Sequence, residues 1–336
     1  MIGWDVGGAN TKAARVAHGQ LLAVCGRPFA VQRTPELLMP LLREIAADLG
    51  VPASTTHAVT MTAELSQAFR TKREGVAFVL GALAAAFPSA PMRVFTVDGR
   101  FVSPAEACAN PLAVAAANWA ATATYIARQH PDAMLIDIGT TTTDIIPIVS
   151  GRVVASGRTD PERLASGELV YTGALRTPVD AIASHVPLNG ARVNVAAEGF
   201  ALAGDVHVWC GRLAEEDYTV PAPDGRPVSR EFCGERLARA ICADREMLDD
   251  AAVSLIAAAL ADAQVARIVD AIRSVVARHP SLTTAVVTGL GAFVAATAAR
   301  AAGLRVVSLA DDLGDEGARF APAAAVALLL DQADGR

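Results

Sequence analysis

Residues 137–144 combine carboxylates, hydroxyls and a glycine at a spacing that suits phosphate chemistry. They read Asp-Ile-Gly-Thr-Thr-Thr-Thr-Asp between two apolar runs. Gly139 lets the backbone turn tightly or approach a ligand closely, and the threonines offer hydroxyl and amide donors to an anion. The carboxylates of Asp137 and Asp144 could hold a divalent metal or accept a proton. Because threonine also favours β-strands, a plain hairpin explains this stretch alone equally well.

The beginning of the chain repeats this arrangement. Residues 5–12 read Asp-Val-Gly-Gly-Ala-Asn-Thr-Lys, and in both stretches an apolar strand ends in Asp-apolar-Gly before a polar turn and a returning strand. Such an internal duplication predicts two similar lobes. A third glycine-bearing turn, at residues 286–292, joins a buried strand to a helix start, where exposed amides bind anions. A Gly-x-Gly pattern by itself is a weak signal.

Alternating strands and helices are expected to position these turns, which makes the chain an α/β protein. Apolar periodicity predicts three short strands over 1–26 and a long alanine-rich helix over 112–128. Residues 157–189 are expected to be rich in loops, because prolines divide them into short segments. A second long helix is expected over 249–279, where apolar residues recur at helical spacing.

Composition narrows the class of protein. A chain of 336 residues exceeds the usual size of a single core, so two domains are expected. A net charge of −6 argues against nucleic-acid or membrane-surface partners. The 5 cysteines form no CxxC pair and are expected to be reduced thiols, with neither a disulfide framework nor a zinc site. No apolar run reaches the ~18 residues of a membrane span, and the chain enters a strand at once, so a cytoplasmic location is expected.

The three turns, in this order, resemble the phosphate-1, phosphate-2 and adenosine elements of the actin, Hsp70 and sugar-kinase superfamily. The resemblance covers nearly the whole chain. It implies a duplicated ribonuclease-H-like fold whose two lobes enclose a central cleft, with the hairpin turns facing each other across it. The first lobe would comprise residues 1–130 and 311–336, and the second residues 131–310 with a helical insertion at about 200–280.

Several blocks resemble a narrower group, the hydantoinase/oxoprolinase-like proteins linked to tetrahydromethanopterin-dependent C1 metabolism. These blocks are residues 3–12, 61–65, 69–76, 115–119, 171–173 and 176–178. The resemblance implies a Mg²⁺-dependent synthase of methanofuran or methylofuran biosynthesis. Such an enzyme condenses an aminomethylfuran-methyl diphosphate with a phenolic tyrosine- or tyramine-type acceptor, forms an aryl ether and releases diphosphate. It is a transferase with a diphosphate leaving group.

This activity assigns expected roles to residues of the three turns. Asp5 and Asp137 are the expected Mg²⁺ ligands, because Mg²⁺ prefers hard oxygen donors. Lys12 is the expected point charge for phosphate. Either Asp144 or Glu64 is expected to remove the phenol proton. The residues expected to bind the diphosphate are Gly7, Gly8, Asn10, Thr11, Gly139, Thr140, Thr141, Thr142, Gly289 and Gly291.

Further residues are expected to bind the organic parts of the substrates. Arg70, Lys72, Arg73 or Arg176 would pair with a carboxylate on the acceptor. Glu198 or Asp205 would pair with the aminomethyl group of the furan. Asn118, in the block before a predicted helix, is a further candidate for substrate binding.

Three alternatives stay open at this point, because the fold alone does not decide function. The first is an ATP-dependent small-molecule kinase, for which ATP or ADP would be the bound cofactor. The second is an ATP-dependent amide hydrolase of the hydantoinase kind, and the third is a non-catalytic ATP-driven switch. The identity of the phenolic acceptor is also open, and a homodimer is expected only as the commonest oligomeric state.

Overall fold

The computed structural model describes residues 1–52 and 54–334. The chain divides into two compact units. Unit 1 contains residues 1–135 and 146–165 and the chain from Val307 onward, and unit 2 contains residues 136–145 and 166–306. The chain therefore passes four times from one unit to the other.

Unit 1 contains a six-stranded sheet with the order β3-β2-β1-β4-β5-β6. Strands β1 and β4 pair in parallel, as do β4 and β5, whereas the first three strands form an antiparallel meander. This meander confirms the three strands predicted for 1–26. The strands are β1 (Ile2–Val6), β2 (Asn10–Ala17), β3 (Gln20–Pro28), β4 (His57–Met61), β5 (Met92–Phe95) and β6 (Phe101–Val102).

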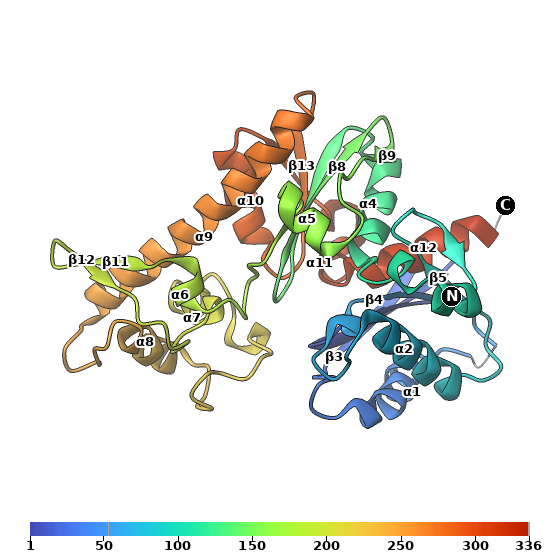
Figure 1. The fold of residues 1–336 in the computed structure, drawn as a ribbon, viewed down its shortest axis with the longest axis horizontal. Coiled ribbons are helices and arrows are strands. Elements are labelled where there is room, and N and C mark those ends of the chain that lie inside the picture. The colour runs from blue at the N-terminus through green and yellow to red at the C-terminus, as the bar shows by residue number, and fades with distance from the viewer. Residues whose placement is uncertain (53, 335–336) are drawn as a thin grey trace. The chain divides into compact units, whose positions relative to one another are not determined.

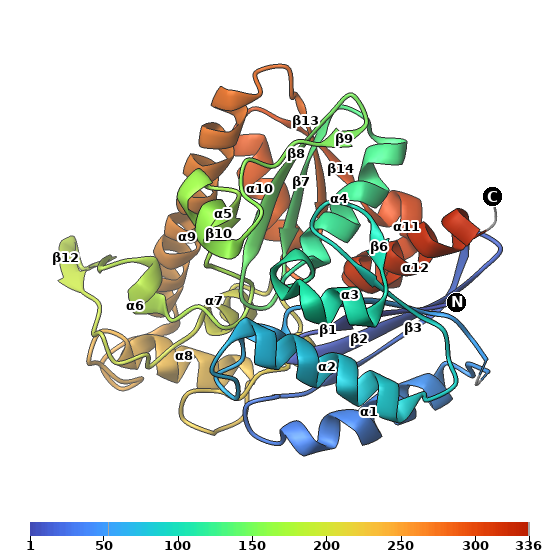
Figure 2. The same ribbon diagram turned by 45° about the vertical axis from the view of Figure 1, so that its right-hand side comes forward.

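Helices α1 and α2 cover one face of this sheet, and α12 packs on β1, β2 and β4 from the other (Figure 2). Gly3 permits this close approach, because a Cβ at that position would overlap the carbonyl oxygen of Ala323. The helices of unit 1 are α1 (Leu38–Asp48), α2 (Lys72–Ala86), α3 (Pro104–Ala109), α4 (Asn118–Gln129), α5 (Asp160–Ser166), α11 (Ala310–Arg319, kinked at Gly314) and α12 (Ala321–Asp334). Three 3-10 turns complete it, at Pro35–Leu37, Ala63–Leu65 and Pro111–Ala113.

The second sheet has the order β10-β8-β7-β13-β14, with β9 paired to β8. All six residues of β7 are buried, as expected for a central strand. The strands are β7 (Ala133–Ile138), β8 (Thr143–Val149), β9 (Arg152–Val153), β10 (Leu169–Val170), β13 (Thr284–Thr288) and β14 (Arg305–Ser308). A separate hairpin of unit 2 consists of β11 (His185–Leu188) and β12 (Ala191–Asn194).

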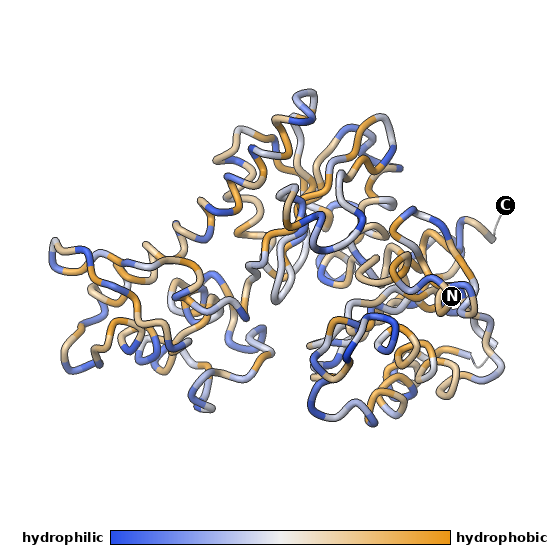
Figure 3. Tube along the Cα trace, viewed as in Figure 1, coloured by the Kyte–Doolittle hydropathy of each residue, from blue (hydrophilic) through white to orange (hydrophobic). Residues whose placement is uncertain are grey.

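The long helix α9 (Asp250–Arg278) organises the rest of unit 2 (Figure 1). It contacts β11, α6 (Val179–Ile182), α7 (Ala203–Trp209), α8 (Arg230–Arg239) and α10 (Ala292–Ala301), and a 3-10 turn lies at Glu215–Asp217. Hydrophobic and hydrophilic residues alternate along α9 (Figure 3). It is the one helix among the described residues that is long and apolar enough to cross a membrane. The apolar residues of α9 pack against these elements and are part of the core.

Two of the sequence predictions are wrong in detail. Residues 157–189, predicted to be rich in loops, contain α5, β10, α6 and β11. Pro161 is compatible with α5 because it lies in the first turn, where a missing amide hydrogen removes no helical bond. The helix predicted over 112–128 begins only at Asn118, because a 3-10 turn and a left-handed Ala116 (φ 50°) precede it.

Candidate functional site

The turn at residues 5–12 is a tight hairpin between β1 and β2, as predicted. Asp5 lies opposite Lys12 in the strand register, and the amide of Gly7 donates to the carbonyl of Asn10 at 2.9 Å. A Cβ on Gly7 would lie 2.6 Å from the same carbonyl oxygen, so the turn requires glycine there. Asp5 is almost fully buried, whereas Gly7, Gly8 and Asn10 are partly exposed. The backbone of the turn is therefore accessible, and the carboxylate lies behind it.

Lys12 has a contact of its own within unit 1. Its Nζ donates to the carbonyl oxygen of Arg319 at 2.9 Å and lies 5.5 Å from the centre of the Phe320 ring. A cation at the carbonyl end of α11 is favourable, because the last carbonyls of a helix carry partial negative charge. The ammonium thus stabilises the end of α11 in this structure, and its contact with phosphate stays a prediction.

The threonine turn, in unit 2, is held from behind by residues 172–177. The amide of Gly139 donates to Thr142 O at 3.0 Å, and the amide of Ala174 donates to Gly139 O at 2.9 Å. The carbonyl of Thr140 accepts from the amides of Leu175 and Arg176 at 3.1 and 2.9 Å. These bonds fix the backbone of the turn, in which Thr140, Thr141 and Thr142 remain partly exposed.

A buried polar network that was not predicted from the sequence supports this arrangement. Gln264 of α9 donates through Nε2 to Thr172 Oγ1 and to Gly173 O, both at 2.9 Å. Its Oε1 lies 2.9 Å from Nε2 of His207, which must carry the proton because an amide oxygen only accepts. Burial lowers the pKa of His207 to about 4, so the ring is neutral. The available signal was Gln264 itself, a polar residue on the apolar face of a predicted helix.

The third turn packs directly on the threonine turn within unit 2. Gly289 has a φ of 87°, and a Cβ there would overlap Asp137 Oδ1 and the carbonyl oxygen of Ile138. The amide of Gly291 donates to the carbonyl of Ile138 at 2.8 Å. The structure thus brings Asp137 together with the two predicted glycine-rich turns of this unit. Asp144 lies nearby along the chain on β8, buried and opposite Leu169 in β10.

Replacing Gly289 with alanine tests this close packing. The substitution G289A is expected to destabilise the protein by roughly 2–4 kcal/mol, because it adds both a clash with Asp137 and a strained positive φ. Gly303, which has a φ of 84° and open space where a Cβ would lie, is the matched control. In urea unfolding, G303A should lose only the part of the unfolding free energy that the strained positive φ costs. Equal losses for the two variants would show that the close packing against Asp137 and the carbonyl of Ile138 is unimportant.

Glu64, in the 3-10 turn after β4, is a buried carboxyl group of unit 1. Its side chain is 0% exposed, and the nearest cation, Lys72 Nζ, lies 4.0 Å from Oε1. Neither oxygen meets hydrogen-bond geometry with a donor among the described residues. Burial raises the pKa of Glu64 to about 7, although Lys72 and the amides of Glu64 and Ala116 pull it down. This carboxyl group therefore exchanges a proton near neutral pH, which suits a general base.

Two charged residues of α5 lie beside this pair, in the segment that was predicted to be a loop. Asp160 Oδ2 accepts from Lys72 Nζ at 2.7 Å. Arg163 lies 3.8 Å from Asp160 Oδ1, and its guanidinium carbon is 4.6 Å from the centre of the Trp119 ring. Glu64 and Lys72, both predicted site residues, thus belong to a charge cluster with Asp160 and Arg163, in which Glu64 and Arg163 are buried and Lys72 and Asp160 are partly exposed.

The other predicted substrate-binding residues are dispersed. Arg70, Arg176 and Glu198 are exposed, so all three side chains are accessible. The amide of Arg70 donates to Glu74 and that of Arg176 to the threonine turn. Asn118 begins α4, and its carbonyl accepts from a threonine one turn later. Substrate contacts of these residues stay predictions.

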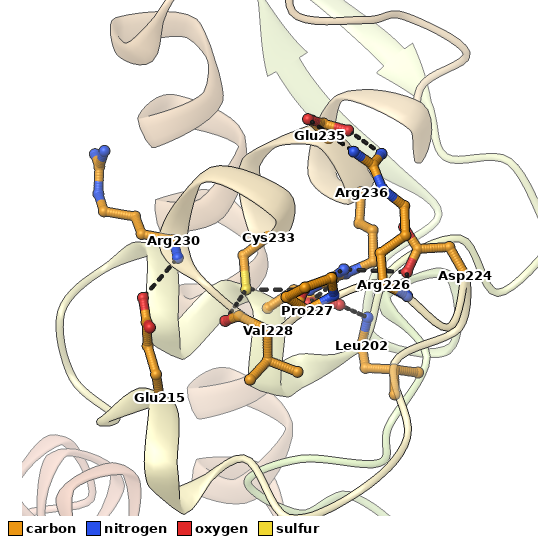
Figure 4. A network of polar contacts seen from close by, with 11 residues as sticks. Leu202, Glu215, Asp224, Arg226, Pro227, Val228, Arg230, Cys233, Glu235 and Arg236 are labelled. Carbon is orange, nitrogen blue, oxygen red and sulfur yellow. Dashed lines mark hydrogen bonds and ion pairs between the residues drawn. The ribbon is translucent and has the colours of Figure 1, made fainter.

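Asp205 lies in the interior of unit 2 and has a structural role there. Its Oδ1 accepts from Arg236 Nε at 2.8 Å, and both side chains are 0% exposed. Its Oδ2 accepts from the amide of Leu202 at 2.8 Å and so caps α7. Figure 4 shows the surrounding network, in which Arg236 also donates to Asp224 and to the carbonyl of Pro227. This burial leaves the carboxylate no exposed surface for an aminomethyl group.

Asp5 and Asp137, the expected Mg²⁺ ligands, would each contribute one carboxylate to the ion. No cluster of three or more His, Cys, Asp or Glu residues capable of holding a metal occurs within residues 1–52 and 54–334. Mg²⁺ is usually bound by one or two carboxylates together with substrate phosphates and water. Asp5 and Asp137, each at a strand end beside a glycine-containing turn, match that pattern. Because they belong to different units, a shared site stays a prediction.

Comparison with known proteins places these features in a family. The sequence profile of the hydantoinase/oxoprolinase family matches residues 55–332. The chain is 35% identical to (4-{4-[2-(gamma-L-glutamylamino)ethyl]phenoxymethyl}furan-2-yl)methanamine synthase of Methanocaldococcus jannaschii, over 98% of this chain and 97% of that protein. It is 31% identical to the synthase of the same name from Methanococcus vannielii, over 59% of this chain and 90% of that protein.

A solved structure supports the fold. Nucleotide-free acetone carboxylase superposes with a TM-score of 0.57 at 12% identity, over 97% of this chain and 69% of that chain. This likeness agrees with the predicted α/β class and the duplicated, two-lobed ribonuclease-H-like fold. The profile match covers most of the sequence, and the relative from Methanocaldococcus jannaschii aligns almost from end to end. The chain therefore belongs to the hydantoinase/oxoprolinase family.

Proposed function

We propose that this protein is a synthase that forms an aryl ether between a furan-methyl group and a phenol in methanofuran-type cofactor biosynthesis. The observation that carries the proposal is the 35% identity, over 98% of the chain, to a synthase with such a product. The name of that product describes a phenoxymethyl group on a furan that also bears a methanamine. The bond that distinguishes it from simpler phenols and furans is the ether between the phenol oxygen and the furan-methyl carbon.

The proposed reaction is a substitution at the furan-methyl carbon. The bond from this carbon to a diphosphate oxygen breaks, and its electron pair leaves with the diphosphate. A lone pair of the phenol oxygen forms the new carbon–oxygen bond, and the phenol proton passes to a base. The furan oxygen stabilises positive charge at the reacting carbon, so the enzyme's main tasks are to stabilise the departing anion and to accept the proton.

The glycine-rich turns supply the groups for the first task. In unit 1, the accessible backbone of Gly7 and Gly8 would donate to phosphate oxygens, and in unit 2 the hydroxyls of Thr140, Thr141 and Thr142 would do so. Asp5 and Asp137 would hold Mg²⁺, which when bound offsets the charge of the departing diphosphate.

The charge cluster of unit 1 supplies the base. Glu64 has a pKa of about 7, so a large fraction is ionised at neutral pH and ready to accept a proton. Lys72 is the more accessible partner, with a side chain 21% exposed. A phenol bound beside Lys72 would be deprotonated by a relay. In this relay the Lys72 ammonium gives a proton to the Glu64 carboxylate and the resulting amine takes the phenol proton, so that the net proton comes to rest on Glu64. We therefore assign the role of base to Glu64, one of the two candidates expected from the sequence.

The decisive experiment combines the purified protein with Mg²⁺, an aminomethylfuran-methyl diphosphate and one of three phenols: tyrosine, tyramine or gamma-glutamyltyramine. We expect equal amounts of diphosphate and of an aryl ether, measured by a coupled phosphate assay and by mass spectrometry. The comparison of acceptors identifies the preferred phenol. ATP hydrolysis or phosphoryl transfer to a small molecule, with no ether from any acceptor, would overturn the proposal in favour of a kinase.

A further inference from the structure

Lys72 lies between two carboxylates but contacts them unequally. Its Nζ is 2.7 Å from Asp160 Oδ2 and 4.0 Å from Glu64 Oε1. The first distance is a charge-assisted hydrogen bond, whereas the second is too long for one. Glu64 is also the more deeply buried carboxylate, at 0% exposure against 16% for Asp160. The Lys72 ammonium is thus hydrogen-bonded to the more exposed carboxylate, although the more deeply buried one is stabilised less by water.

Asp160 is itself fixed in place. It is the first residue of α5, and Arg163 lies one turn later with its guanidinium 3.8 Å from Asp160 Oδ1. The Arg163 side chain is only 2% exposed and stacks on Trp119. Gly157 allows the chain to fold back on this helix, because a Cβ there would lie 2.6 Å from the amide nitrogen of Arg163. The position of Asp160 is therefore set by packing in the interior of unit 1.

We propose that Asp160 is a positioning residue that holds the Lys72 ammonium away from Glu64 and so keeps Glu64 able to accept the substrate proton. The inference rests on the proposed function only in naming the phenol as the source of that proton. The charged groups facing Glu64 are Lys72 from α2 and Asp160, backed by Arg163, from α5. The amides of Glu64 itself and of Ala116, before α4, also lower its pKa.

This arrangement predicts opposite effects from removing the two partners of Glu64. In D160N the Lys72 ammonium is free to approach Glu64 and the neighbouring negative charge is lost, so the pKa of Glu64 should fall by about one unit or more. In Lys72→Met the cation is lost and the pKa of Glu64 should rise by a similar amount. If Asp160 merely supported the fold, D160N would not lower the pKa of Glu64 while Lys72→Met raises it.

The test measures the titration of Glu64 without relying on activity. Urea unfolding between pH 4.5 and 9 is recorded for the wild type, D160N and Lys72→Met, each with and without Glu64→Gln. Within each pair, the difference in unfolding free energy changes with pH where Glu64 titrates, because glutamine does not ionise. We expect the pH at which this difference stops changing, here called the midpoint, to lie lower in D160N and higher in Lys72→Met than in the wild type. Asp48→Asn, which breaks the exposed ion pair with Arg27, is the control and should leave the midpoint unchanged.

Two outcomes overturn the inference: unchanged midpoints in both variants, or shifts in the same direction. The pH profile of ether formation adds a second readout, since its acid limb should move with the midpoint in D160N. If no ether forms under any condition while the midpoints still move in opposite directions, the proposed function fails and the positioning role of Asp160 is retained. If ether forms but its acid limb does not follow the midpoint, Glu64 is not the base.

Discussion

Replacing Glu64 with glutamine is expected to reduce the rate of ether formation by about 10²–10⁴-fold, the usual contribution of a general base. Glutamine has nearly the same shape but cannot accept the phenol proton at neutral pH. The loss should appear in kcat, while the KM for the furan diphosphate stays near that of the wild type, because the glycine-rich turns are untouched. Glu44→Gln, which alters an exposed carboxylate of the same unit, is the control and should leave the rate unchanged.

The same substitution is expected to stabilise the protein above pH 7. Glu64 has a pKa of about 7 in the folded chain, against 4.5 for the free side chain. The folded state therefore binds the proton more tightly, so its stabilising effect is complete below pH 4.5 and is lost as the pH rises through 7. At pH 8 the buried charge costs about 3 kcal/mol by the 1.36 kcal/mol per pKa unit relation. Glu64→Gln should recover a large part of this at pH 8 and little at pH 5.

Urea unfolding of wild type and variant at the two pH values provides the measurement. His57 is buried too, and burial lowers its pKa to about 4 from 6.5. Its contribution has the opposite sign, since stability is complete above pH 6.5 and is lost as the pH falls toward 4. Because both proteins carry His57, this contribution cancels in the difference. If Glu64→Gln loses the same stability at both pH values, Glu64 is a packing residue and its charge does not destabilise the folded state.

Local sequence signals were sufficient for the turns, whereas the ribonuclease-H-like fold was expected from the resemblance to the actin, Hsp70 and sugar-kinase superfamily. Asp-apolar-Gly followed by polar residues and a second apolar run fixes a hairpin through turn chemistry within about ten residues. Both hairpins, at residues 5–12 and 137–144, are present as expected. The repeat of the same pattern then indicates a duplicated fold, since each copy requires the same neighbouring strands.

Only two of the four residues of the charge cluster, Glu64 and Lys72, were predicted as site residues, and the reason is physical. Glu64 and Lys72 are eight residues apart, whereas Asp160 is 88 residues further along than Lys72. No local signal connects α5 to α2, and the prolines around α5 concealed the helix itself. The ion pair of Asp205 was missed for a related reason: a carboxylate in an apolar context indicates either a ligand site or a buried partner, and Arg236 is 31 residues away. Local patterns determine elements, but pairing between distant charges depends on tertiary packing.

The buried pair of Asp205 and Arg236 gives the largest expected effect on stability. Arg236→Met removes the cation and leaves an uncompensated carboxylate among Cys233, Tyr218 and Leu202, which should destabilise the protein by about 3–5 kcal/mol. Burial already raises the pKa of Asp205, and only Arg236 and the hydrogen bonds oppose that effect. The loss should therefore become smaller at acidic pH, where Asp205 can take up a proton and become neutral.

Three further variants separate the ion pair from packing. Asp205→Leu combined with Arg236→Met should regain much of the lost stability, because replacing a whole buried pair with apolar side chains is often neutral. Arg226→Met, which breaks a more exposed pair with Glu235, should cost less than about 1 kcal/mol. Asp205→Asn should lower stability while the KM for the furan diphosphate stays constant in the folded fraction. A KM at least tenfold higher with unchanged stability would instead return Asp205 to the substrate-binding role that its sequence context suggested, and would require the Arg236 pair to open when substrate binds.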